Sequence, residues 1–101
     1  MAMKKIRPIR IEGNIAFIPL TKGYEAIVDA GDVPLVGGRN WFATEMRKPD
    51  GSICAVYATR TDVTDGRKRN VHMHRLIASP ATSLHVDHIS GNGLDNRRSN
   101  L

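Results

Sequence analysis

The chain has 101 residues, of which 41% are hydrophobic, and carries a net charge of +5. This length predicts one small domain, and the excess positive charge is typical of a protein with an anionic partner, such as nucleic acid or an acidic membrane surface. The one cysteine, Cys54, excludes an internal disulfide framework and Cys-rich zinc knuckles, and its apolar neighbours predict that it is buried. No stretch approaches the roughly 20 apolar residues of a membrane span. We therefore expect no membrane partner and an intracellular, reducing location.

The first part of the chain predicts a basic arm followed by antiparallel strands. Residues 1–12 are rich in lysine and arginine, and they form either a frayed, solvated terminus or an arm that follows phosphates. Apolar runs bounded by turn residues predict strands over 15–20 and 24–29, with Pro19 at a strand end or a sheet edge. One helical turn is expected over 33–36, before a pair of glycines.

Residues 13–70 are expected to form one antiparallel β region, which could present a basic face to a DNA groove. Strands over 41–47 and 52–60 are joined by a Pro-Asp-Gly turn. The nearly continuous apolar side chains of 52–60 predict a strand buried on both faces, and Trp41 is expected in the core. A second turn follows at 64–66. Beside it lie three cations that either stay solvated or contact a DNA backbone: Arg67, Lys68 and Arg69.

The last third of the chain predicts short, mixed elements. Residues 71–73 either form a strand or lead straight into a helix over 75–78, which ends before Pro80. A strand over 84–88 follows, then a glycine-bracketed loop, and then a helix that begins near Asn96. The fold class expected from the whole pattern is α+β, with antiparallel β-hairpins followed by a short helix.

The residues with chemical potential gather at the end of the chain. Asp87 offers a carboxylate, which is a hard oxygen ligand for Mg²⁺ or Mn²⁺, and the adjacent His88 can take a proton from water near neutral pH. Arg97 and Arg98 lie in the first turn of the expected helix, where the helix dipole disfavours cations. Their position indicates either a phosphate nearby or plain solvated arginines.

Several of these residues together resemble the HNH endonuclease motif, of the type found in phage and intron-encoded homing endonucleases. The similarity rests on Val86-Asp87-His88, Gly91-Asn92-Gly93, Asp95-Asn96-Arg97-Arg98 and Asn100-Leu101. Upstream, Met73-His74-Arg75-Leu76-Ile77 resembles the segment that precedes this motif. The region from Ile18 through Trp41 and Val56-Tyr57-Ala58 to Met73 is similar to phage HNH proteins with an AP2-like DNA-binding region, so the resemblance covers about residues 15–101.

The resemblance implies a fold, a reaction and roles for single residues. Residues 71–101 would form a partial ββα-metal (His-Me) finger around one Mg²⁺ or Mn²⁺ ion. Asp87 would bind the ion, His88 would be the general base, and Asn100 would stabilise the finger and orient the base. His74 and Arg75 would face phosphates together with Arg97 and Arg98. The implied partner is double-stranded DNA, and the implied location is the cytoplasm of a bacterial or phage-infected cell.

The chain departs from the family pattern at its end. In the family, the last helix continues past the Asn-Leu pair, and a further His or Asn on it completes the metal site. Because this chain ends at Leu101, we expect weak metal binding and little or no nuclease activity from these 101 residues. The alternatives are a non-catalytic DNA-binding module and an inactive fragment.

Overall fold

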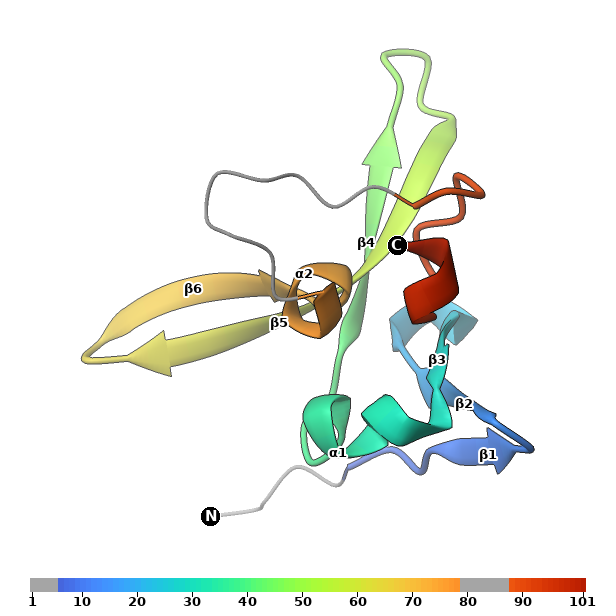
Figure 1. The fold of residues 1–101 in the computed structure, drawn as a ribbon. Helices are drawn as coiled ribbons and strands as arrows, with labels where there is room; N and C mark the ends of the chain where they lie inside the picture. Colours follow the sequence, from blue (N-terminus) through green and yellow to red (C-terminus); the bar gives the residue numbers. More distant parts are fainter. Residues whose placement is uncertain (1–5, 79–87) are drawn as a thin grey trace.

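The computed structural model describes residues 6–78 and 88–101 of the chain. In these residues the chain forms two antiparallel sheets of three strands each and two short α-helices (Figure 1). The first sheet has the order β1-β2-β3, and its strands are Arg10–Glu12, Ile15–Pro19 and Glu25–Asp29. The second has the order β4-β5-β6, and its strands are Phe42–Arg47, Ile53–Thr64 and Arg67–His72. The helices are α1, Val33–Val36, and α2, Met73–Ala78.

The predicted α+β class with antiparallel hairpins is confirmed. The strands β2 and β3 and the single helical turn α1 lie where the sequence predicted them, and Pro19 is the last residue of β2. The strand β1 was not predicted, because residues 1–12 were expected to form only a basic arm. The finger is not confirmed. The strand expected over 84–88 falls almost entirely on residues outside the described part of the chain, and so does Asp87.

Alternating burial along β2 and β3 builds one side of the core. Ala16 and Ile18 of β2 are buried and face Val28 and Ala26 of β3 in the strand register, while their neighbours are partly exposed. This alternation follows from the two-residue period of a strand, which puts every second side chain on the same face. The first sheet therefore covers the core with one face.

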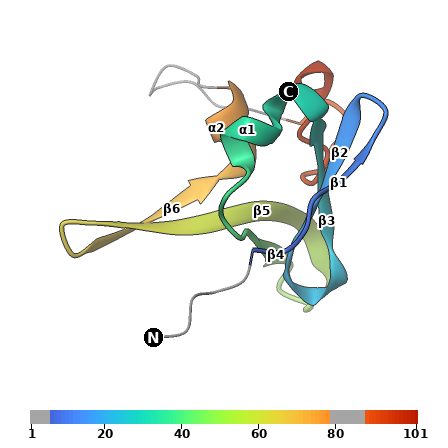
Figure 2. The same ribbon diagram turned by 90° about the horizontal axis from the view of Figure 1, so that it is seen from below.

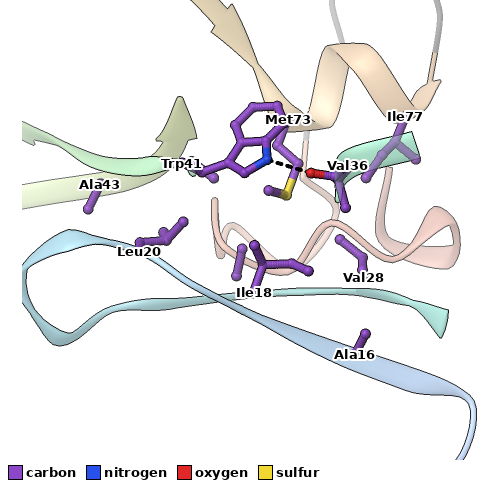
Figure 3. Packing of buried hydrophobic residues seen from close by; sticks show 11 residues of the cluster. Ala16, Ile18, Leu20, Val28, Val36, Trp41, Ala43, Met73 and Ile77 are labelled. Carbon is purple, nitrogen blue, oxygen red and sulfur yellow. Dashed lines mark hydrogen bonds between the residues drawn. The ribbon is translucent and has the colours of Figure 1, made fainter. Parts of the chain in front are cut away.

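Trp41 is the largest buried side chain and joins the first sheet to the helices. It is 1% exposed, which confirms its predicted place in the core. Its indole N–H donates a hydrogen bond of 2.9 Å to the carbonyl of Val36 at the end of α1 (Figure 3). Met73 and Ile77 of α2 close the same cluster, and both are fully buried.

The second sheet differs from the sequence expectation in its burial. The strand predicted over 52–60 runs on to Thr64, and only Ala58 and Thr59 are buried among its residues, so the prediction of burial on both faces is wrong. Cys54 is also exposed, contrary to prediction. Figures 1 and 2 show the reason: the β4–β5 and β5–β6 hairpins extend past the core, which covers only the middle of β5. Apolar composition alone does not reveal how far a strand reaches beyond its packing partners.

The C-terminal segment pairs with β3 instead of starting a helix at Asn96. The amide of Ile27 donates to the carbonyl of Leu94, and the amide of Asn96 donates to the carbonyl of Ile27, both at 2.7 Å. Asp95 thereby forms a parallel bridge with Ile27, and the helix predicted from Asn96 is replaced by a 3₁₀ turn over Arg98–Asn100. An extended backbone that has sheet partners cannot also form the hydrogen bonds of a helix.

Part of the basic N-terminal segment lies on the body of the fold. Residues Arg10–Glu12 form β1 against β2, and the Arg10 guanidinium lies 4.2 Å from the centre of the Phe17 ring. The guanidinium of Arg7 donates to the carbonyl of Trp41 at 2.9 Å. Among the described residues, no helix is long and apolar enough to span a membrane.

The buried Trp41 supports a stability prediction. Trp41→Ala should lower the free energy of unfolding by about 3–5 kcal/mol, because it removes the central side chain of the core and leaves a cavity. Urea unfolding followed by circular dichroism measures the change. Val63→Ala is the matched control, since Val63 is 63% exposed and its loss should change stability by no more than about 0.5 kcal/mol. Equal effects of the two substitutions would contradict this assignment of the core.

Candidate functional site

His88 lies at the wall of a cavity of about 600 Å³ between the second sheet and the C-terminal segment. Its Nε2 atom is 2.7 Å from the amide oxygen of Asn96. Its ring centre lies 4.8 Å from that of His74 in α2, and 5.9 Å from that of Tyr57 in β5. The cavity is lined by histidines, one tyrosine and residues of β4 and the C-terminal loop: Thr44, Met46, Tyr57, His72, His74, His88 and Gly91.

One face of the second sheet forms a wall of this cavity, and the strand register determines which residues lie on that face. Thr44 of β4 pairs with Tyr57, and Thr59 pairs with His72, so these residues form neighbouring rows on one face of the sheet. Ala58 points to the opposite face and enters the core. The hydroxyl of Thr59 lies 3.3 Å from Nδ1 of His72, and the His72 ring stacks on that of His74 with centres 5.6 Å apart.

Asn100 holds the loop that follows His88. Its side-chain oxygen accepts the amide N–H of Ser90 at 2.9 Å, and its side-chain NH₂ donates to the carbonyl of Asp95 at 2.8 Å. Its own carbonyl accepts the amide of Ile89 at 2.8 Å. Asn100 is 7% exposed, so these bonds are shielded from water. The side chain thus links both ends of the loop, which is a bracing role, and both of its polar groups bond to the backbone and not to the imidazole of His88.

The two glycines of the loop serve different purposes. Gly91 has φ of +80°, a left-handed conformation that glycine adopts without steric cost. Gly93 has no such requirement, but a Cβ atom on it would lie 2.3 Å from the carbonyl oxygen of Val56 and 2.8 Å from the Tyr57 ring. The absence of a side chain at Gly93 therefore lets the loop approach β5 closely, beside the ring that contacts His88.

Arg97 and Arg98 are held by carboxylates of the chain itself. Arg97 makes two hydrogen bonds to Asp95, at 2.7 and 2.8 Å, which hold the pKa of the Asp95 carboxyl below its usual value. Arg98 binds Asp32 through its guanidinium at 2.8 Å, and its amide donates to Asp29 at 3.0 Å. These partners explain the position of both cations, and the contacts of Arg98 with Asp29 and Asp32 attach the C-terminal segment to the rest of the fold.

The cations Arg67, Lys68 and Arg69 have a different setting. They are exposed on β6, directly after the Asp65-Gly66 turn, where the β5–β6 hairpin extends from the body (Figures 1 and 2). Within the described residues no carboxylate forms an ion pair with any of them. Arg67 and Arg69 border a second hollow of about 520 Å³ at the hairpin tip. His74 and Arg75 lie elsewhere, on the first turn of α2, and only His74 lines the His88 cavity.

A divalent ion does not find a complete site among the described residues. No group of three or more His, Cys, Asp or Glu side chains within residues 6–78 and 88–101 could hold a metal. The side chains near His88 offer imidazole nitrogens and one amide oxygen, whereas Mg²⁺ and Mn²⁺ prefer carboxylate and other oxygen ligands. These residues alone do not fit Mg²⁺ or Mn²⁺, and the carboxylate predicted for that role, Asp87, lies outside the described part.

Tyr57 and Asn96 were not predicted as site residues. The two-residue period of β5 was a usable signal for Tyr57, since it must lie opposite to the core residue Ala58. Nothing local in the sequence indicates that the Asn96 side chain meets His88, because that contact depends on the pairing of Asp95 with β3. No protein-family model, curated protein or solved structure was found to match this chain.

Gly93→Ala tests the close approach of the loop to β5. The added methyl group would collide with the backbone oxygen of Val56, so the free energy of unfolding should fall by about 1–3 kcal/mol. The matched control is Gly31→Ala, because a Cβ atom there would meet nothing within 4 Å. Chemical denaturation measures both variants. If Gly93→Ala is as stable as Gly31→Ala, the loop does not pack on β5 as described.

Arg97→Gln tests the ion pair with Asp95 through its pH dependence. Because the pKa of folded Asp95 is lowered, chiefly by its hydrogen bonds from Arg97, the pair stabilises the fold above the unfolded carboxyl pKa of about 3.9. This contribution disappears as the pH falls through the folded pKa. Arg97→Gln should therefore reduce stability near neutral pH and make its loss on acidification less steep, measured by urea unfolding between about pH 2 and pH 7.

The control for this experiment is Arg39→Gln. It removes an exposed arginine that pairs with Asp62 at 2.7 Å, and such surface pairs contribute little. An Arg97→Gln protein whose stability follows the same pH curve as the wild type would contradict a role for the Arg97–Asp95 pair.

Proposed function

We propose that this chain is an HNH-type DNA endonuclease, which hydrolyses a phosphodiester of double-stranded DNA with His88 as the general base. The observation that carries the proposal is the setting of His88. Its imidazole forms part of a cavity wall, and a 2.7 Å hydrogen bond to the buried Asn96 holds one of its nitrogens. A general base needs this combination of access to the substrate and a fixed orientation. Asn100 supports it by bracing the loop that starts at His88.

The proposed reaction is a direct attack of water on phosphorus. The imidazole of His88 takes a proton from a water molecule, and the water oxygen forms a bond to phosphorus while the bond to the leaving sugar oxygen breaks. The sugar oxygen then takes a proton from solvent, so no covalent intermediate with the protein arises. Tyr57 and His74 pack around the His88 ring and limit its rotation.

The ion in this proposal is Mg²⁺ or Mn²⁺, and Asp87 is the residue proposed to hold it. When bound, such an ion would stabilise the negative charge that develops on the phosphate and on the leaving oxygen. The proton transfer is assigned to the His88 imidazole, which Asn96, Tyr57 and His74 surround.

The distribution of charge supports DNA as the partner. Several arginines on the body of the fold pair with nearby carboxylates, as Arg97 does with Asp95 and Arg98 with Asp32. Arg67, Lys68 and Arg69 have no such partner among the described residues, and they lie on an extended two-stranded ribbon (Figure 2). A two-stranded ribbon fits the DNA major groove, and lysine and arginine bind phosphates without regard to base sequence. We therefore place the main phosphate contacts on this hairpin, with His74 and Arg75 of α2 nearer to the reaction.

A non-catalytic DNA-binding module is the second candidate. It is favoured by the contrast between the basic hairpin, which is complete, and the metal site, for which the described residues supply no group of three ligands. The two candidates differ only in whether DNA that is bound is also cut.

Plasmid nicking tests the endonuclease proposal. The wild-type chain with Mg²⁺ or Mn²⁺ should convert supercoiled DNA to the open circle only slowly, because the described residues supply no complete metal site. His88→Ala should slow this conversion by a further factor of about 10²–10⁴ because the general base is lost. Binding of DNA by His88→Ala should be unchanged, which gel-shift titration measures. Nicking that survives in His88→Ala would overturn the role of this residue.

The same proteins decide between the two candidates through binding. Replacing Arg67, Lys68 and Arg69 by Gln should weaken DNA affinity and reduce the slope of log K against log salt by up to about 3, because each phosphate contact contributes about 1. Arg10→Gln is the control, since Arg10 is paired with Glu25 at 3.3 Å on the opposite sheet. Binding without nicking supports the second candidate, and a chain that neither binds nor nicks overturns both.

A further inference from the structure

We infer that Asn96 is the positioning residue of His88, and that it determines which imidazole nitrogen carries the proton. This inference rests on the proposed function for its meaning, since the proposed reaction needs one imidazole nitrogen with a free lone pair. The family resemblance assigned the orientation of the base to Asn100. The structure assigns it to a different asparagine, four residues earlier in the chain.

The Asn96 side chain is placed to act on His88 and on little else. Asn96 is 0% exposed, and its side-chain oxygen lies 2.7 Å from Nε2 of His88. Its NH₂ group is buried and has no hydrogen-bond partner among the described residues. A buried amide that leaves its donors unused costs free energy. The contact of the side-chain oxygen with His88 is thus the interaction that explains a buried asparagine at this position.

The chemistry of the contact fixes the tautomer. An amide oxygen can only accept a hydrogen bond, so Nε2 of the neutral His88 must carry the proton. The other nitrogen, Nδ1, then holds the lone pair and is the atom that can take a proton from water. The side chains around the ring that could titrate or carry charge are Tyr57 of β5, His72 of β6, His74 of α2 and Asp95 beside Asn96.

Asn100 is not available for this role. Both polar atoms of its side chain are already bound to the backbone, the oxygen to Ser90 and the NH₂ to Asp95. The backbone of Asn96 is held separately, because its N–H donates a hydrogen bond to the carbonyl of Ile27 in β3. The first sheet thus determines the place of the amide oxygen, and the amide oxygen determines the protonation of His88.

The experiment is nuclear magnetic resonance of the full 101-residue chain without DNA or metal. Long-range proton–nitrogen correlation, recorded at about pH 8.5 where imidazole is ordinarily neutral, distinguishes the two tautomers of a histidine. The wild type should show the Nε2–H form at His88. Asn96→Ala should show a mixture of tautomers or the Nδ1–H form. Asn92→Ala is the matched control: Asn92 lies in the same loop, but its side chain accepts the amide of Leu94 and should leave His88 unchanged.

Asn96→Asp keeps the proposal testable if the alanine variant does not fold. Aspartate has the same shape and retains an acceptor oxygen, so the Nε2–H signal of His88 should persist. An unchanged tautomer in a folded Asn96→Ala protein, or loss of the Nε2–H form in a folded Asn96→Asp protein, would overturn the inference.

If the chain cuts DNA, enzyme kinetics provide a second test of the role of Asn96. Asn96→Ala should lower kcat by roughly 10- to 100-fold, the range found when a metal-binding histidine loses the partner that orients it, with KM for DNA little changed. Equal losses in kcat and DNA affinity would instead indicate general disruption and count against the inference. The tautomer measurement needs no catalysis, so a chain that fails to nick DNA overturns the proposed function without deciding the role of Asn96.

Discussion

The pairing of residues 94–96 with the outer edge of β3 is the constraint on which the candidate site depends. Ile27 uses both its amide and its carbonyl in this pairing, and two backbone hydrogen bonds of 2.7 Å hold the segment. The ion pair of Arg98 with Asp32 attaches the following turn to the segment before α1. These bonds join residues almost 70 positions apart and hold the C-terminal segment, whose residues His88 and Gly91 line the cavity. His88 acquires its surroundings from this long-range contact.

Charge is used in two ways in this small fold. On the body, several arginines pair with carboxylates: Arg98 attaches the C-terminal turn to Asp32, and the hydrogen bonds from Arg97 lower the pKa of the Asp95 carboxyl. On the β5–β6 hairpin, Arg67, Lys68 and Arg69 have no carboxylate partner within the described residues, so their charge is directed to solvent or to an anionic partner. The net charge of +5 is therefore not spread evenly over the surface. Three cations without a carboxylate partner among the described residues lie together on a hairpin that extends from the core (Figure 1).

Much of the local structure could be predicted because it depends on neighbouring residues. The turn at Asp65-Gly66 follows from positive φ angles that glycine tolerates, and β2 and β3 follow from alternating apolar residues. The predictions that Cys54 is buried and that a helix begins near Asn96 were wrong for the same reason. Both predictions used local composition, whereas the outcome depended on where the core ends and on which strand edge the chain meets.

The sequence by itself determined the fold class, the hairpins, the core position of Trp41 and the choice of His88, Asn100 and the hairpin cations as residues of interest. Apart from the choice of Asn100, which rested on the resemblance to HNH endonucleases, these conclusions follow from period, turn chemistry and side-chain type, which are properties of short segments. Only the tertiary structure decided that Arg97 and Arg98 bind carboxylates, that Gly93 gives room to Tyr57 and that Asn96 meets His88. The contacts of Arg98 and Gly93 join segments that are distant in sequence, and the contact of Asn96 with His88 depends on the pairing of Asp95 with β3. They form because burial and hydrogen bonding of the whole chain must be satisfied together.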